Sequence, residues 1–336
     1  MTYCSDNCWA LVLAGGEGSR LRSLTTTMTG VAIPKQFCSL RGGDSLLYQA
    51  LQRAEFVALR EHVCAVVAAR HQSWWQKLLN RLPPGNVVVQ PGNCGTASGV
   101  LLPLMDIMAS DADASIVILP SDHHVDSEAI LARALREATH ALERRPNDIL
   151  LLGMQPDEPD PELGYIVPGL ADADGTAAVL RFVEKPAAPA ARELITEGAL
   201  WNAFIIVARA GALLALFERS APELVSAMRQ ARGISTQPTS PTSLQSLYRT
   251  MAPLDFSRHI LPGQESHLRV IPVPACGWTD LGTPKRVALM LSRPCLGGPE
   301  AFDKIEDSGV LNLAVQYRRQ QQGSEFAGLA VSASNG

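Results

Sequence analysis

Short apolar segments rich in β-branched residues alternate with amphipathic helical patterns through the first half of the chain. The strand candidates are residues 9–14, 63–68, 86–90, 115–120 and 148–153. Between them, the stretch that begins at Ser45 and the segment 127–143 place apolar side chains three and four residues apart, which predicts helices with one buried face. Because the strand candidates are apolar on both faces, we expect βαβ units that form a mainly parallel sheet between two layers of helices.

The pattern changes after Gly153. A connector rich in proline and acidic residues occupies 155–162, and further strands are expected at 164–168, 177–184, 204–208 and 267–273. We expect helices near 187–197, 209–218 and 222–232, and a polar, proline-rich surface loop at 236–243. The chain is therefore expected to form one domain over residues 1–293, made of the halves 1–153 and 154–293, and a partly disordered C-terminal tail over 294–336.

Composition argues against several classes of partner. The chain has 29 Lys and Arg against 33 Asp and Glu, a net charge of −4, so it lacks the basic excess that nucleic-acid binding requires. Its apolar runs are far shorter than the ~20 residues of a membrane helix, and the N-terminus predicts no signal peptide. The 7 cysteines never form a C-x-x-C pair, which favours free thiols in the cytoplasm over disulfides or a zinc site.

The strongest single feature is a glycine-rich segment directly after the first expected strand, Leu13-Ala14-Gly15-Gly16-Glu17-Gly18-Ser19-Arg20-Leu21. Glycine turns let main-chain N–H groups approach phosphate oxygens closely. The segment fits neither the G-x-G-x-x-G fingerprint nor the Walker A loop. Arg20 inside it, and Lys35 in the run Pro34-Lys35-Gln36-Phe37, add two cations, which suits a polyphosphate ligand.

Five motifs, taken in order over roughly residues 9–292, resemble those of the sugar-1-phosphate nucleotidylyltransferases. The glycine-rich segment with Pro34-Lys35-Gln36-Phe37 resembles the family signature, in a form most similar to the mannose-1-phosphate guanylyltransferases. The other motifs are Leu119-Pro120-Ser121-Asp122-His123-His124, Phe182-Val183-Glu184-Lys185-Pro186, Trp201-Asn202 and Trp278-Thr279-Asp280-Leu281-Gly282-Thr283. The resemblance implies a Rossmann-like, three-layer α/β/α nucleotide-diphospho-sugar transferase fold with a mainly parallel mixed sheet. Residues 1–153 would bind the nucleotide and residues 154–293 the sugar phosphate.

The resemblance also implies a reaction. A sugar 1-phosphate oxygen would attack the α-phosphorus of a nucleoside triphosphate and displace pyrophosphate. Since both reactants are anions, catalysis would depend on charge neutralisation and alignment. Asp122 and Asp280 would hold Mg²⁺, which prefers few carboxylates together with phosphate oxygens. Arg20 would bind the β- and γ-phosphates, and Lys35 would act at the α-phosphate.

Two further sets of residues are implied as substrate-binding. The nucleotide-binding residues would be Leu13, Ala14, Gly15, Gly16, Gly18, Ser19, Gln90, Gly95 and Thr96. The sugar-phosphate-binding residues would be Gly164, Glu184, Lys185 and Asn202. Lys185 would bind the phosphate, and Glu184 would accept hydrogen bonds from sugar hydroxyls. From the residues alone, Gln90 is as well explained by an ordinary loop amide, and Glu184 with Lys185 by a surface charge pair.

Some features depart from the family pattern or compete with it. The segment between Arg20 and Lys35 is long, and we expect residues 25–30 to close as a lid over the triphosphate. Ala203 and Phe204 replace the Ser-Gly that follows the asparagine in the family, which weakens the sugar contacts expected there. His123 and His124 flank the expected metal aspartate, where we expect supporting roles and not ligation, because Mg²⁺ prefers oxygen.

Two segments, Asp111-Ala112-Asp113 and Asp172-Ala173-Asp174, have the D-x-D spacing of glycosyltransferase metal sites. We expect solvated loop carboxylates at both. A glycosyltransferase would need one of them at its metal centre.

The preferred substrates are GTP and mannose 1-phosphate, and three rival functions stay open. The first is the same reaction with glucose or heptose 1-phosphate and UTP, dTTP or ATP. The second is a non-catalytic regulatory paralogue that binds an NDP-sugar, and the third is the glycosyltransferase. We expect no nucleic-acid or membrane partner, and the sequence does not decide between a monomer and a homo-oligomer.

Overall fold

The computed structural model describes residues 7–234, 243–292 and 310–320. Most of the expected proline-rich loop and most of the expected C-terminal tail lie outside these described residues. The chain divides into two compact units that interleave along the sequence. Unit 1 comprises Met1–Gly16, Ala50–Pro120 and Val125–Trp278, and unit 2 comprises Glu17–Gln49, Ser121–His124 and Thr279–Gly336. This division follows different boundaries from the expected halves 1–153 and 154–293.

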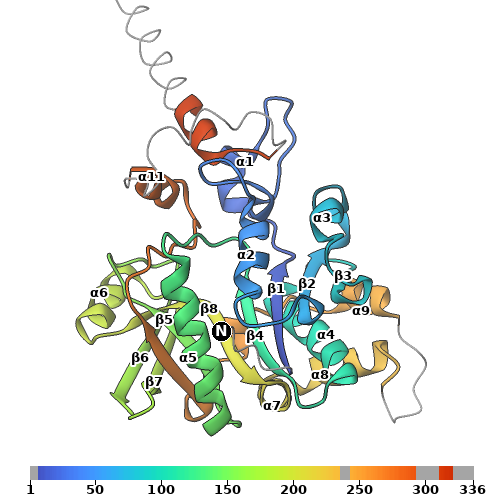
Figure 1. The fold of residues 1–336 in the computed structure, drawn as a ribbon, viewed down its shortest axis with the longest axis vertical. Helices are drawn as coiled ribbons and strands as arrows, with labels where there is room; N and C mark the ends of the chain where they lie inside the picture. Colours follow the sequence, from blue (N-terminus) through green and yellow to red (C-terminus); the bar gives the residue numbers. More distant parts are fainter. Residues whose placement is uncertain (1–6, 235–242, 293–309, 321–336) are drawn as a thin grey trace, which may run out of the picture. The chain divides into compact units, whose positions relative to one another are not determined.

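Unit 1 is built on a mixed sheet whose nine strands, in the described part of the chain, lie in the order β3-β2-β1-β4-β8-β5-β9-β7-β6 (Figure 1). The strands are β1 (Cys8–Ala14), β2 (Val63–Ala68), β3 (Val87–Gln90), β4 (Ser115–Pro120), β5 (Ile149–Met154), β6 (Gly164–Ala171), β7 (Ala177–Glu184), β8 (Leu200–Arg209) and β9 (Leu268–Val273). β8 is antiparallel to β4, β5 and β6, and β7 is antiparallel to β6 and β9, while the other pairs are parallel. All strands except β7 and β8 therefore point the same way, which confirms the expected mainly parallel mixed sheet.

Helices cover both faces of this sheet. Along β5, Ile149 and Leu151 belong to a core cluster that also contains residues of α4 (Gly95–Ser110), α7 (Ala210–Ser220) and α8 (Pro222–Ala231). Successive strand residues point to opposite faces, so the equally buried Leu150 and Leu152 face the other side. There α5 (Glu128–Arg144) contacts β5, β8 and β9. The expected three-layer α/β/α fold is confirmed.

The remaining helices are shorter. They are α2 (Leu46–Ala54), α3 (Gln72–Leu79), α6 (Ala188–Thr196), α9 (Leu244–Thr250) and α10 (Phe256–His259), with α1 (Arg22–Thr25) and α11 (Pro284–Ser292) in unit 2. Unit 2 also contains two 3₁₀ turns, η1 (Ser19–Leu21) and η2 (Lys35–Phe37).

Unit 2 has its own small core, to which part of the expected C-terminal tail contributes. Leu21, Leu24, Leu281 and Val287 are buried in it together with Leu313. The main-chain N–H of Leu313 donates to the oxygen of Ser39 at 2.8 Å. Residues 313–320 are helical. Within the tail expected over 294–336, the described part is thus integral to the unit.

The segment expected to act as a lid forms a short hairpin in unit 2. Thr26 and Ala32 form an antiparallel bridge, and the N–H of Thr27 donates to the oxygen of Val31 at 2.8 Å. At its tip Met28 is 87% exposed. Closure of this hairpin over a triphosphate stays a prediction.

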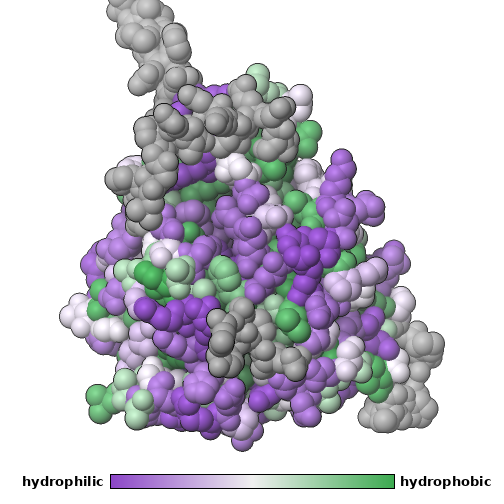
Figure 2. Space-filling view, viewed as in Figure 1, coloured by the Kyte–Doolittle hydropathy of each residue, from purple (hydrophilic) through white to green (hydrophobic). Residues whose placement is uncertain are grey.

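Hydrophilic residues predominate on the face shown in Figure 2, where apolar residues are scattered in small groups. Among the described residues, no helix combines the length and the apolar character needed to cross a bilayer. The described cysteines Cys8, Cys38, Cys64, Cys94 and Cys276 are free and buried.

Candidate active site

The glycine-rich segment follows β1 and requires glycine at two positions. In unit 1, a Cβ added to Gly15 would lie 2.9 Å from Gln90 Oε1. In unit 2, Gly18 has a φ of +60°, and a Cβ there would lie 2.9 Å from the main-chain nitrogen of Lys35. Ser19 then starts the turn η1, and Arg20 is exposed. Gly15 thus lies close to Gln90 within unit 1, and Gly18 lies close to Lys35 within unit 2.

Lys35 is the centre of a charged cluster within unit 2. Its ammonium is buried, and Nζ lies 2.9 Å from Asp122 Oδ2 and 2.6 Å from the main-chain oxygen of Asp280. Asp122 lies two residues after the end of β4, past the carboxyl end of a parallel strand, where α/β sheets bind their ligands. The structure thus brings together three of the four predicted catalytic residues, which are far apart in the sequence.

Arg20, the fourth, points to the same cluster. A Cβ added to Gly282 would lie 2.2 Å from Asp280 Oδ2 and 3.2 Å from Arg20 Nη2. The N–H of Gly282 donates to Asp280 Oδ1 at 3.0 Å, and Arg286 Nε lies 3.6 Å from the same oxygen. Arg286 is a further buried cation at this site that the sequence interpretation did not identify.

The electrostatics of the cluster favour an ionised Asp122. Burial would raise the pKa of its carboxyl, but the positive charge of Lys35 and the nearby His123 outweigh burial, so the pKa lies below the usual value. His123 Nε2 lies 3.7 Å from Asp122 Oδ1. His124 instead pairs its main chain with Thr279 at 2.9 Å in both directions, which ties the two aspartate segments together.

The donor set of unit 2 suits a magnesium ion that is shared with a substrate. Asp122 keeps 37% of its side chain exposed, while Asp280 is buried. Among the described residues, no group of three or more His, Cys, Asp and Glu side chains could hold a metal by itself. Mg²⁺ is commonly bound by one or two carboxylates plus phosphate oxygens and waters, so two aspartates fit it without a third protein ligand.

Gln90 lies at the end of β3 in unit 1, where its Nε2 donates to the Tyr248 hydroxyl at 2.9 Å. Tyr248 is buried, and its hydroxyl accepts this hydrogen bond from the NH₂ side of the Gln90 amide. Within the part of the chain that the structure describes, Gln90 Oε1 has no hydrogen-bond partner. An acceptor oxygen is thus presented beside Gly15.

The predicted sugar-binding residues meet where β6 pairs with both β7 and β8. Gly164 is opposite Glu184 on β7 and opposite Asn202 on β8. A Cβ at Gly164 would lie 2.6 Å from Glu184 Oε2, so any other residue there would displace this carboxylate. Burial raises the pKa of Glu184 to about 7, aided by the charge of Asp255 and opposed by Lys185 and Arg258.

Asn202 has its amide engaged by protein groups. Its Nδ2 donates to Ser257 Oγ at 3.4 Å, and its Oδ1 accepts the N–H of Phe204 at 3.1 Å. Phe204 has a φ of +55°, a conformation that glycine adopts readily, and its ring packs on Phe256 with centroids 5.7 Å apart. Phe204, which stands where the family has glycine, is therefore held in the left-handed conformation by packing against Phe256.

Lys185 lines an open cavity of about 500 Å³ in unit 1. The lining residues are Asn93, Gly95, Lys185, Pro253, Asp255, Arg258 and His259. Lys185 has a φ of +50°, and its N–H donates to the oxygen of Leu163 at 3.2 Å, which fixes this unfavourable backbone conformation. The α10 residues in this lining were missed by sequence interpretation, because no motif marks them.

Gly95 and Thr96, predicted to bind nucleotide, make protein contacts at the start of α4. A Cβ at Gly95 would lie 2.2 Å from the Leu254 oxygen, and Thr96 Oγ1 accepts the N–H of Phe256 at 2.8 Å. These contacts hold the segment that carries α10. The roles of Leu13, Ala14, Gly16 and Ser19 in nucleotide binding stay predictions.

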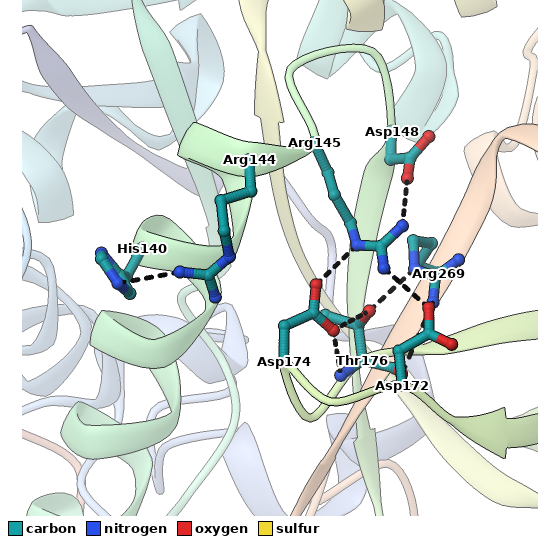
Figure 3. Close-up of polar contacts among 8 residues, drawn as sticks. All are labelled: His140, Arg144, Arg145, Asp148, Asp172, Asp174, Thr176 and Arg269. Carbon is teal, nitrogen blue, oxygen red and sulfur yellow. Dashed lines mark hydrogen bonds and ion pairs between the residues drawn. The ribbon is translucent and has the colours of Figure 1, made fainter.

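Neither D-x-D segment is arranged as a metal centre. Asp172 and Asp174 bind Arg145, and Asp172 also binds Arg269 (Figure 3). Asp174 Oδ1 additionally accepts the hydroxyl of Thr176 at 2.8 Å. These carboxylates are neutralised by arginines, in a network at the turn between β6 and β7.

The other D-x-D segment, after α4, is equally occupied by protein groups. Asp111 Oδ2 accepts Trp9 Nε1 at 3.3 Å, and its Oδ1 accepts the N–H of Asp113 at 3.1 Å. Neither D-x-D segment is therefore arranged to bind the metal ion that a glycosyltransferase would need.

The class of protein follows from two features. One is the mixed α/β sheet with a glycine-rich segment after its first strand, and the other is the buried lysine bound to two aspartate segments. Together they are typical of transferases that act on nucleotides. The sequence model of the Nucleotidyl transferase family matches residues 9–289, so the chain belongs to this family. The predicted resemblance is thereby confirmed.

The chain is similar to several curated relatives. It is 28% identical over 278 residues to the alginate biosynthesis protein AlgA of Pseudomonas syringae pv. tomato, covering 81% of this chain and 56% of that protein. It is 28% identical over 279 residues to the mannose-1-phosphate guanylyltransferase RfbM of Salmonella typhimurium, with 81% and 56% covered. The chain spans about half the length of the curated relatives it matches.

A solved structure from Thermus thermophilus, titled a mannose-1-phosphate geranyltransferase, has a TM-score of 0.73 to this chain at 24% identity, and the match covers 86% of this chain and 80% of that one. A mannose-6-phosphate isomerase structure from Helicobacter pylori has a TM-score of 0.61 at 19% identity, covering 81% and 99%. At these identities the likeness concerns the fold alone.

Proposed function

We propose that the protein joins GTP and mannose 1-phosphate to give GDP-mannose and pyrophosphate. The observation that carries this proposal is the buried ammonium of Lys35, bound to Asp122 and to the main chain of Asp280 beside Gly18. A buried cation with an adjacent glycine turn suits phosphate oxygens. Two nearby carboxylates suit the metal ion that accompanies a triphosphate.

Charge neutralisation is the main task in this reaction, because an anionic sugar phosphate attacks an anionic triphosphate. Arg20 would hold the β- and γ-phosphates, and Lys35 would stabilise the charge that develops around the α-phosphorus. The attacking oxygen belongs to the sugar phosphate, so no covalent enzyme intermediate is needed. Alignment of the two substrates then supplies the rest of the rate enhancement.

Asp122 and Asp280 would hold Mg²⁺ together with phosphate oxygens. When bound, the ion withdraws charge from the triphosphate and favours departure of pyrophosphate. Lys35 neutralises Asp122 in the structure, so rearrangement of this ion pair would accompany metal binding.

The choice of base is supported by the orientation of Gln90. Its Oε1 is an acceptor beside Gly15, while its Nε2 is held by Tyr248. Guanine offers two adjacent N–H donors, at N1 and N2, on its Watson–Crick edge, and uracil and thymine offer one at N3. Adenine offers a donor only at its exocyclic N6, beside the acceptor N1, which a carboxamide oxygen does not satisfy. Gln90 therefore supports GTP over ATP and leaves UTP and dTTP as rivals.

The choice of sugar is supported by the names of two relatives, which are mannose-1-phosphate guanylyltransferases. Glucose or heptose 1-phosphate are the alternatives. A regulatory paralogue that only binds an NDP-sugar is disfavoured, because Arg20, Lys35, Asp122, Lys185 and Asp280 are all retained.

Release of pyrophosphate over a grid of nucleoside triphosphates and sugar 1-phosphates, with and without Mg²⁺, tests this proposal. We expect turnover with GTP, mannose 1-phosphate and Mg²⁺. Turnover with another nucleotide and sugar phosphate would show that the proposed substrates are wrong and that the proposed reaction type is right. No turnover in the grid, combined with tight binding of an NDP-sugar, would support the regulatory rival.

We also propose that the protein works in the cytoplasm, where nucleoside triphosphates are available and buried thiols stay reduced. Subcellular fractionation tests this. Light scattering of the purified chain would decide between a monomer and a homo-oligomer.

A further inference from the structure

The cavity that Lys185 lines in unit 1 has an unusual polar composition. Lys185, Arg258 and His259 contribute nitrogen groups, Asp255 contributes a carboxylate, and the apolar contribution among the lining residues is limited to Pro253. Ligand cavities are generally lined mainly by apolar and aromatic groups. This lining therefore suits a small ligand that is itself charged and rich in hydroxyls.

Among the described residues, the two strongest cations of the cavity form no close ion pair, although both lie near enough to Glu184 to lower its pKa. Within the described residues, no hydrogen bond or ion pair joins the Lys185 ammonium or the Arg258 guanidinium to another group. Both side chains are exposed to the cavity and solvent. Arg53 and Arg145, by contrast, form close ion pairs, at 2.6 Å from Glu128 and from Asp174.

Arg258 is carried by a firmly held segment. Its main-chain N–H donates to Asp255 Oδ1 at 3.0 Å, which caps α10. Phe256, fully buried, donates its N–H to Thr96 Oγ1, and the N–H of Ala97 donates to the Leu254 oxygen at 3.0 Å. The backbone that positions Arg258 is thus tied to the start of α4.

We propose that Arg258 is a second phosphate-binding residue of the sugar 1-phosphate site, acting beside Lys185 in this cavity. The proposal rests on the proposed function, since it assigns the position of that substrate. A sugar phosphate carries up to two negative charges near neutral pH, which match the two unpaired cations. Arginine can bind two phosphate oxygens at once, a geometry that a second lysine would not reproduce.

The carboxylates of the site explain why the ligand is a sugar phosphate and not a bare polyphosphate. Glu184 and Asp255 are close enough for the charge of Asp255 to influence Glu184. Carboxylates repel additional phosphate groups but accept hydrogen bonds from hydroxyls. A ligand with one anionic end and one hydroxyl-rich end satisfies both sets of side chains.

The test compares Arg258→Met and Arg258→Lys with wild type in titration calorimetry against mannose 1-phosphate, glucose 1-phosphate and free mannose, and in steady-state kinetics. Arg258→Met should raise the dissociation constant for the sugar 1-phosphate about tenfold or more, because charged hydrogen bonds are lost. Affinity for free mannose and KM for GTP should stay unchanged. Arg258→Lys should recover part of the loss. Arg192→Met, at an exposed arginine of α6, is the matched control.

Three results would overturn the assignment. Wild-type turnover and sugar 1-phosphate affinity retained in Arg258→Met would show that Arg258 does not contact the phosphate, while leaving the proposed function intact. Equal losses for GTP, mannose and sugar 1-phosphate would show a structural role. A wild-type protein that binds and turns over no sugar 1-phosphate would reject the proposed function itself, and the assignment with it.

Discussion

Lys35 Nζ lies 2.9 Å from Asp122 Oδ2, and this ion pair joins two segments of unit 2 that are far apart in the sequence. The same ammonium donates to the main-chain oxygen of Asp280 at 2.6 Å. One buried charge therefore holds both aspartate segments of unit 2. In the proposed function, a metal ion bound at Asp122 would take over part of the charge neutralisation that Lys35 supplies in the structure.

Asp122→Asn should lower turnover by at least about 100-fold, since it removes a charge that positions the metal and the triphosphate. Asparagine keeps the size and one acceptor oxygen, but the buried Lys35 ammonium loses its anionic partner. The free energy of unfolding should fall by about 1–3 kcal/mol. Pyrophosphate release and denaturant unfolding measure the two effects. Glu223→Gln, at an exposed position of α8, is the control, and near-normal turnover in Asp122→Asn would contradict the two-aspartate site.

Tyr248→Phe should weaken the choice of base. Without the hydroxyl, the Gln90 amide is free to turn and present either its oxygen or its NH₂ group. We expect the ratio of kcat/KM for GTP to that for ATP to fall by about tenfold, since about one hydrogen bond of discrimination is lost. Competition assays with both nucleotides measure this ratio. Tyr48→Phe is the control and should leave the ratio unchanged. An unchanged ratio in Tyr248→Phe would show that Gln90 does not recognise the base.

Glu184→Gln should change how stability depends on pH. The folded pKa of Glu184, about 7, lies above the unfolded value. The stabilisation is therefore fully present below the unfolded pKa and is lost as the pH rises through about 7. Glutamine imitates the protonated carboxyl, so the Tm of wild type should fall relative to that of Glu184→Gln between about pH 5 and about pH 8. Parallel Tm profiles would argue against the raised pKa, and Glu193→Gln serves as the control.

Asp174→Asn should destabilise the protein without affecting turnover. The carboxylate binds Arg145 at 2.6 Å and Thr176 at 2.8 Å, and its loss should cost about 1–3 kcal/mol of unfolding free energy. At temperatures where the variant is folded, kcat/KM should stay within about twofold of wild type. Loss of turnover in folded Asp174→Asn would instead indicate that the segment Asp172-Ala173-Asp174 takes part in the reaction, for example as a metal site.

Two central strands were predictable because their residues are consecutively apolar and buried. β2 and β4 begin and end where the sequence predicted, and every residue in them is buried. β7 also has the predicted bounds, although its residues are only partly buried. The long helix α4 gave no comparable signal. Its residues are buried on nearly every side and include Pro103, so no amphipathic stripe marks it as a helix.

Part of the candidate site was predictable for a similar reason. Lys35, Asp122 and Asp280 lie in ordered motifs, and Asp122 closely follows an apolar strand. Tyr248 and Arg258 lie in no motif, and their contacts with Gln90 and with the Lys185 cavity join residues far apart in the sequence. Only the folded chain brings such residues together, so no local sequence pattern predicts their contacts.

The interleaved course of the chain has a consequence for synthesis on the ribosome. The described lining of the cavity at Lys185 ends at His259, whereas Asp280 and the core residue Leu313 of unit 2 are made later. A nascent chain therefore contains its complete cavity residues before it contains the last member of the Lys35 cluster. The capacity to transfer a nucleotide would be the last property that the growing polypeptide acquires.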